Sequence, residues 1–231
     1  MKNSTLAFIL IILLSCPGWA QDSNTARQRV GIEVSDPAAK AVLDELRQKY
    51  ESYNSLQAEF SLEIKFPNQQ EEIQYGTLNQ RGEQYRLTMA SQTVISDGEA
   101  LYLILHNNEE VQINDLPEEG EDQNILSPQN MLGIYQSDDF LYALTDERME
   151  DGRLLQFIEF KPTDESSDYF KIRLVVDKSS KQIVRVLAFA RDGSRYAFRI
   201  DKLQPNVDFP PGYFEFDKSE YPDYYVEDLR Y

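Results

Sequence analysis

The apolar residues of this chain follow a helical period near the start and an alternating period over most of the rest. The helical pattern runs through residues 36–53 and comprises Ala39, Val42, Leu43, Leu46, Tyr50 and Tyr53. Asp36 and Pro37 come first, and they supply a capping side chain and a proline at the first helical position. The pattern predicts one amphipathic helix over residues 36–53.

Strands are predicted for most of the chain after this helix. Apolar side chains alternate with polar ones at Ala58, Phe60, Leu62, Ile64 and Phe66. This alternation is typical of a strand with one covered face. A second helix is predicted to begin at Ser127 and Pro128, after the acidic stretch 116–124, and to carry Met131 and Leu132.

Asp-Gly pairs at 97–98, 151–152 and 192–193 indicate three hairpins. Asp-Gly favours a two-residue turn because both central residues of that turn need positive φ. Such a turn at 192–193 predicts that the flanking strands pair Phe189 with Tyr196, Leu187 with Phe198 and Arg185 with Ile200. One face of this hairpin would then be large and apolar, and the other small and charged.

These elements predict a single domain of the α+β class over residues 36–231. It would be a long antiparallel sheet whose apolar face is covered by a few helices. We find no internal repeat, low-complexity domain or interdomain linker in the sequence.

Residues 1–20 have the composition of a secretory signal peptide. Lys2 is followed by nine apolar residues, Leu6–Leu14, whereas spanning a bilayer takes about 20. Gly18 and Ala20 predict cleavage before Gln21, and therefore export. Residues 21–35 are expected to form a flexible N-terminal segment.

Charge and composition narrow the chemistry further. The chain has 23 basic and 40 acidic residues, a net charge of −17, and loss of Lys2 with the leader would make it −18. Such a charge repels nucleic acid and anionic membrane surfaces, which need neutralised phosphates.

No catalytic or metal-binding motif is visible. His106 is the single histidine, so it would have to serve any Ser-His-Asp triad, and its Asn- and Glu-rich surroundings favour a solvated turn instead. A zinc site needs several His or Cys ligands. The carboxylates lie mostly in surface-like runs. We therefore expect a binding protein without a cofactor, not an enzyme. Its apolar face could be an ordinary core or a lined cavity, and periodicity does not choose between them.

An ordered series of segments resembles the periplasmic outer-membrane lipoprotein carrier family, LolA. The segments are Gly76-Thr77-Leu78, Arg81, Tyr85-Arg86-Leu87, Val94–Tyr102, Tyr169–Leu174, Val176-Asp177-Lys178, Asp192–Tyr196, Pro205-Asn206, Phe214-Glu215-Phe216 and Asp228-Leu229-Arg230. The resemblance implies an unclosed antiparallel β-barrel, a half-barrel, with helices covering its concave apolar face. It implies a monomeric periplasmic chaperone that takes acylated lipoproteins from an inner-membrane LolCDE-type ABC exporter to an outer-membrane LolB-like acceptor.

The resemblance also implies where the acyl chains would bind. The expected cavity residues are Phe60, Leu62, Ile64, Leu87, Met89, Leu187, Phe189, Tyr196 and Phe198 from strands, with Met131 and Leu132 from a helical lid. Each of these could equally belong to a plain core. An arginine after the Gly-x-Leu strand latches the lid in the family, which implies Arg81, with Arg86 as the alternative. Either arginine could instead be a solvated strand-end residue.

Three rival functions remain from the sequence. If Cys16 were kept and lipidated, the chain would resemble LolB, the lipid-anchored acceptor, although Pro17 fits a lipoprotein box poorly and removal with the leader is expected. An RseB-like envelope-stress sensor would need a further domain. A hydrolase with paired carboxylates has no supporting motif.

Overall fold

The computed structural model describes residues 31–116, 135–136 and 138–230. The chain divides into the units Met1–Gly31 and Ile32–Tyr231, and the second contains all the elements named here. They are α1 (Pro37–Glu51), β1 (Leu56–Lys65), β2 (Glu72–Arg81), β3 (Gln84–Met89), β4 (Gln92–Ser96), β5 (Ala100–Leu105), β6 (Glu110–Asp115), β7 (Phe140–Glu150), β8 (Arg153–Pro162), β9 (Tyr169–Asp177), β10 (Gln182–Ala190), β11 (Arg195–Pro205), the 3₁₀ helix η1 (Lys218–Glu220) and β12 (Tyr225–Asp228).

Helix α1 forms where the apolar spacing predicts it. The Asp36 carboxylate caps its start by accepting a hydrogen bond from the Ala38 backbone N–H at 2.8 Å, and Pro37 opens the first turn. The side chains on one face are buried, namely Ala39, Leu43, Leu46 and Tyr50. Within the described residues, no helix has the length and hydropathy that crossing a membrane requires.

Twelve strands form one sheet in the order β12-β6-β5-β4-β3-β2-β1-β11-β10-β9-β8-β7. Neighbouring strands are antiparallel, except that β12 pairs with β6 in parallel. The end strands β12 and β7 do not pair with each other in the described part of the chain, so the sheet is unclosed. The antiparallel, unclosed sheet is therefore confirmed.

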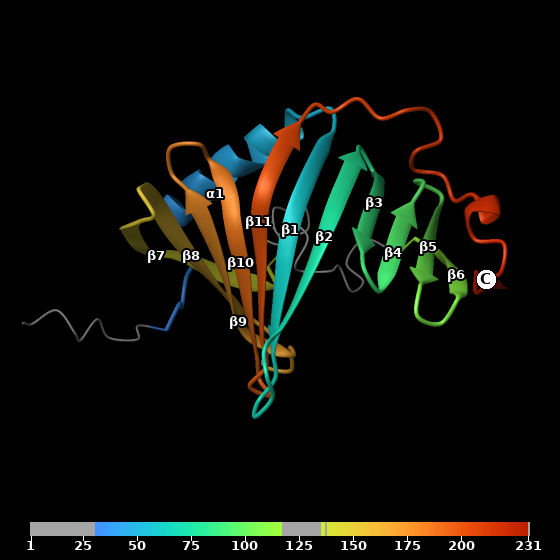
Figure 1. Ribbon diagram of the computed structural model, residues 1–231. Helices are drawn as coiled ribbons and strands as arrows, with labels where there is room; N and C mark the ends of the chain where they lie inside the picture. Colours follow the sequence, from blue (N-terminus) through green and yellow to red (C-terminus); the bar gives the residue numbers. More distant parts are fainter. Residues whose placement is uncertain (1–30, 117–134, 137, 231) are drawn as a thin grey trace, which may run out of the picture. The chain divides into compact units, whose positions relative to one another are not determined.

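One face of this sheet, which we call the inner face, is the one that α1 covers. Figure 1 shows α1 lying across this face behind β9, β10 and β11. The core beneath it includes Ala58, Phe60, Ile158, Phe160, Ile172, Leu174, Val186 and Phe198. In the described residues α1 is the one α-helix of this cover, and the predicted helix from Ser127 falls outside them except for its last residue, Tyr135.

Tyr135 is buried, and its hydroxyl donates a hydrogen bond to Asp44 of α1 at 3.0 Å. Burial and the neighbouring Asp44 carboxylate raise the pKa of Tyr135 to about 12. This contact ties residue 135 to the helix that covers the inner face.

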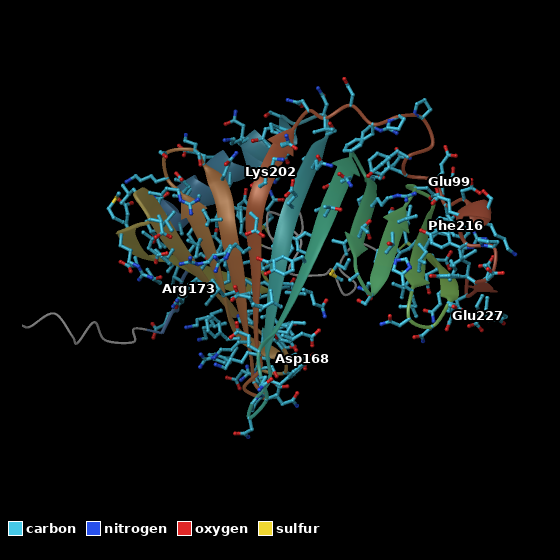
Figure 2. All side chains as sticks on the ribbon, in the orientation of Figure 1. Glu99, Asp168, Arg173, Lys202, Phe216 and Glu227 are labelled. Carbon is cyan, nitrogen blue, oxygen red and sulfur yellow. The ribbon has the colours of Figure 1, made fainter. Side chains whose placement is uncertain are left out.

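The opposite, outer face is covered over β4, β5 and β6 by the segment that follows β11. Ile95, Ile104 and Val111 are fully buried there. Aromatic side chains of residues 207–230 cover them, and the Phe216 ring stacks on Tyr102 with 5.0 Å between centroids. Figure 2 labels Phe216 beside β5 and β6. Periodicity gave no indication of this cover, because the segment that provides it is irregular.

The predicted register of the 192–193 hairpin is wrong. The turn has a three-residue loop, in which Ala190 N donates to Ser194 O at 3.0 Å. Of the Asp-Gly pair, only Gly193 has positive φ. The observed pairs are Ala188 with Tyr196, Val186 with Phe198, Phe189 with Arg195 and Arg185 with Arg199.

This one-residue difference moves every side chain of β10 to the other face. Leu187 and Phe189 therefore lie on the outer face, away from α1. At 151–152, by contrast, both residues have positive φ, and Glu150 pairs directly with Arg153. The two-residue turn is correct there.

Candidate functional site

A row of apolar side chains crosses the inner face beyond α1. Leu78 of β2 pairs with Leu87 of β3, Leu87 with Val94 of β4, and Val94 with Leu103 of β5. Strands lie about 4.8 Å apart, so the row extends roughly 14 Å across the sheet. Leu78 is buried, whereas Leu87, Val94 and Leu103 are only half-buried.

Further half-buried apolar residues widen this row along the same face. We call the set the inner patch: Leu62, Ile64, Leu87, Met89, Val94, Leu101, Leu103 and Leu105. At its border, burial raises the pKa of the Tyr85 phenol. The inner patch is thus an apolar surface that the described residues leave partly exposed.

Gly76 connects the inner patch to the core under α1. A Cβ atom at this position would lie 2.5 Å from the Phe60 ring, 2.7 Å from the Thr88 carbonyl oxygen and 2.9 Å from Met89 Cγ. Glycine therefore lets the Phe60 ring lie over β2, between Phe198, whose ring centroid is 4.7 Å away, and Met89. The sequence marks Gly76 only as part of a motif, so its packing role was not predicted.

Most of the predicted cavity residues do share the inner face. The strand register and the core contacts place these seven there: Phe60, Leu62, Ile64, Leu87, Met89, Tyr196 and Phe198. Phe60 and Phe198 are buried core residues rather than exposed lining. Leu187 and Phe189 lie on the other face, as the corrected register requires, and Met131 and Leu132 fall outside the described residues. A role in holding acyl chains stays a prediction for the inner-face residues.

Arg81 lies on the outer face at the end of β2. Its guanidinium group lies 5.1 Å from the centroid of the Phe214 ring and donates to Gln84 Oε1 at 3.1 Å. Gly82 follows with φ +60°, which proline, fixed near −65°, could not adopt. The described contacts of Arg81 are therefore with β3 and with the segment after β11.

Arg86 is held more tightly by the same segment. It donates to the Glu215 carbonyl oxygen at 3.2 Å, lies 5.4 Å from the Tyr213 ring centroid, and approaches Glu220 Oε2 at 3.9 Å. Its Nε atom is buried without a hydrogen-bond partner among the described residues. Residues 117–134 are not described, so the lid latch stays a prediction for both arginines.

His106 is bound to neighbouring side chains rather than solvated. Nε2 lies 3.0 Å from Thr93 Oγ1, Nδ1 lies 3.3 Å from the Tyr224 hydroxyl, and the Tyr221 ring stacks on the imidazole. These partners are hydroxyl groups and an aromatic ring, and no described carboxylate hydrogen-bonds to the imidazole. The described residues also contain no cluster of three or more His, Cys, Asp or Glu side chains arranged to bind a metal.

Comparisons with solved structures find the same fold elsewhere. An uncharacterized conserved protein from Thermus thermophilus is 10% identical, with a TM-score of 0.54 over 83% of this chain and 99% of that one. A LolA superfamily protein from Nitrosomonas europaea is 14% identical, with a TM-score of 0.42 over 78% and 98% of the two chains. The lipoprotein LppX from Mycobacterium tuberculosis is 10% identical, with a TM-score of 0.48 over 76% and 100%. Comparison with curated proteins finds no match.

The family comparison is more specific than these structural likenesses. The model of one family, described as outer membrane lipoprotein carrier protein LolA, matches residues 51–217. The match runs from the last residue of α1 to the segment that covers the outer face, and it includes the whole inner patch. Because it spans well over half of the sequence, the chain belongs to the LolA family.

Proposed function

We propose that this protein is a periplasmic carrier that holds the acyl chains of lipoproteins on the inner patch. One observation carries the proposal: in a LolA-family sheet, the apolar side chains of β3, β4 and β5 remain half-exposed on the face that α1 covers elsewhere. An apolar surface of this extent on an acidic protein favours association with hydrocarbon.

The energetics of acyl-chain binding explain why the patch should be incompletely covered. Burying hydrocarbon contributes about 0.8 kcal/mol per CH₂ group, so a long acyl chain is worth roughly 10 kcal/mol. A carrier that kept all of this would not release its cargo. Displacing a cover from the patch would offset part of the gain. The flexible thioether of Met89 suits a surface that must accept different chains.

The cellular setting belongs to the same proposal. The leader-like residues 1–20 support export, and the route would run from an inner-membrane LolCDE-type exporter to an outer-membrane LolB-like acceptor. The stretch Leu13–Cys16 supports a second candidate, a lipid-anchored acceptor. The intact mass of the exported protein separates the two, because an acylated Cys16 would contradict the freely diffusing carrier.

A binding experiment with two neighbouring residues tests the role of the inner patch. Leu87 and Thr88 are adjacent on β3, but Leu87 points to the inner face while Thr88 is exposed on the outer face. We expect Leu87→Glu to abolish binding of a fluorescent triacylated lipopeptide, and Thr88→Glu to leave binding unchanged. The milder variant Leu103→Ser should weaken binding without disturbing the core.

The outcome is informative only for folded variants, so thermal unfolding is measured in parallel. Equal lipopeptide binding by Leu87→Glu, Leu103→Ser and the unmodified chain would contradict the proposal. So would equal loss of binding in Leu87→Glu and Thr88→Glu, since that result would indicate a general charge effect.

A further inference from the structure

The outer face of β1, β9, β10 and β11 is strongly basic, in contrast to the chain as a whole. We call this the outer basic face: Lys65, Lys171, Arg173, Arg185, Arg195, Arg199 and Lys202. These are seven of the 23 basic residues of a chain with net charge −17. The same four strands present only three carboxylates there, Glu59, Glu63 and Glu159, and Asp201 lies in the adjacent bulge. Figure 2 labels Arg173 and Lys202 on this part of the sheet.

Like charges are directly opposed at two places on this face. Lys65 pairs with Arg195 across β1 and β11, and Arg185 pairs with Arg199 across β10 and β11. Directly opposed like charges destabilise a sheet. Arg185 and Arg199 are each relieved by a glutamate, at 2.7 and 3.4 Å. Lys65 and Arg195 have no carboxylate within ion-pair distance in the described part of the chain.

An apolar element lies among these cations. The Phe189 ring centroid lies 4.6 Å from Lys171 Nζ and 6.0 Å from the Arg195 guanidinium carbon. The Phe170 ring, whose residue is 47% exposed, lies 6.1 Å away. Phe189 is on this face because of the three-residue loop at 192–193.

A hollow of about 240 Å³ adjoins Phe189 on the same face. Its lining residues include Glu63, Lys65, Leu187, Arg195 and Ala197. Ala197 pairs with Glu63 on one side and with Leu187 on the other, so its small side chain leaves the hollow between larger neighbours. The hollow has room for one apolar side chain from outside the molecule.

We propose that the outer basic face binds an acidic segment of a protein partner. Carboxylates of the partner would pair with Lys65 and Arg195, and one apolar side chain would enter the hollow beside Phe189. Charge complementarity of this kind fixes orientation and speeds association, while a buried apolar anchor supplies most of the affinity. The site lies on the opposite face from the inner patch and does not depend on lipid binding there.

The loops next to this face favour a peptide over a membrane surface. The loop between β8 and β9 carries Asp164, Glu165 and Asp168, and the loop between β10 and β11 carries Asp192. The two loops are joined by a hydrogen bond from Arg191 N to Asp168 O of 2.8 Å. A flat anionic bilayer would meet these carboxylates together with the cations, whereas a peptide can contact the cations alone.

Fluorescence anisotropy with a labelled peptide tests the proposal. The probe is a single phenylalanine flanked by glutamates, and a second peptide with lysine in place of glutamate is the comparison. We expect the acidic peptide to bind, more weakly as salt increases, and the lysine peptide not to bind. Arg195→Glu should weaken binding by at least about tenfold, equivalent to about 1.4 kcal/mol.

Two further variants separate the site from its alternatives. Lys218→Glu makes the same charge change on an exposed residue of η1, and it should leave binding of the acidic peptide unchanged. Ala197→Leu fills the hollow without changing any charge, and it should weaken binding of the acidic peptide. Thermal unfolding verifies that each variant is folded.

The following results would overturn the proposal. They are failure of the acidic peptide to bind the folded, unmodified chain at low salt, equal binding of the lysine peptide, or equal loss of affinity in Lys218→Glu. Unchanged affinity in Ala197→Leu would reject the apolar anchor. Binding to phosphatidylglycerol vesicles that is lost in Arg195→Glu, without peptide binding, would assign the face to a membrane surface instead.

Discussion

The two parts of the inner face differ in what covers them, although their strands have the same alternating pattern. Under α1 the apolar side chains of β8 and β9 are completely buried, with Ile158, Phe160, Ile172 and Leu174 all at 0% exposure. On β3, β4 and β5 the equivalent row stays half-buried. The difference teaches that alternation determines which face is apolar, whereas the cover determines whether that face is core or binding surface.

The largest expected effect is on stability, from residues on either side of this division. Leu43 of α1 is completely buried against the inner face. We expect Leu43→Ala to lower the free energy of unfolding by about 2–5 kcal/mol, because it removes buried methyl groups and leaves a cavity. Leu103→Ala, on the inner patch, should cost less than about 1.5 kcal/mol, because its side chain is only partly withdrawn from water.

Urea unfolding measures both variants under the same conditions. A comparable loss in the two would show that the inner patch is packed as tightly as the core. The distinction between core and binding surface would then fail.

The boundary between the two parts gives the next prediction. Gly76→Val would place a side chain where the Phe60 ring and the rigid Thr88 carbonyl oxygen now lie. We expect a loss of about 1–3 kcal/mol from overpacking. Gly31→Val is the control, because no atom lies within 4 Å of a Cβ there. Calorimetric Tm values measure both, and equal values for the two variants would show that Phe60 moves aside without cost.

The sequence predicted the elements better than their cover. Asp36, Pro37 and the spacing from Ala39 to Tyr50 define α1 because helix capping and amphipathicity are local. The register at 192–193 was mispredicted because Asp-Gly also fits a three-residue loop, and the choice between loops reverses the face of Phe189. The role of Gly76 depends on contacts with Phe60, which is distant in sequence and has no local signal.

The outer face shows the same contrast in a different form, since the segment after β11 covers it only over β3–β6. Arg86 is largely buried under this segment, with its side chain 17% exposed, whereas Arg81 is exposed. We expect Arg86→Ala to cost about 1–3 kcal/mol, because the Glu215 carbonyl oxygen loses a charged donor. Arg81→Ala should cost less than about 0.5 kcal/mol, as is usual for an exposed residue.

Hydrogen exchange localises this effect. Faster exchange in residues 207–230 of Arg86→Ala, with unchanged exchange in α1, is the expected result. Unchanged exchange in this segment would show that its aromatic packing on Ile95 and Ile104 suffices without Arg86.

The smallest effect concerns pH and again compares the two parts of the inner face. Tyr50, under α1, is 6% exposed and accepts a hydrogen bond from Ile183 N at 3.2 Å, and burial raises the pKa of its phenol. A pKa raised in the folded state means that the associated stability is complete below about pH 10, the unfolded value, and is lost as pH rises above it. At pH 11 this loss is limited to about 1.4 kcal/mol. We expect Tyr50→Phe to flatten the decline of stability between pH 10 and 11 more than Tyr85→Phe does, because Tyr85 is only half-buried at the border of the inner patch. Urea unfolding at several pH values gives both slopes, and a steeper contribution from Tyr85 would mean that the inner patch excludes water as completely as the core under α1.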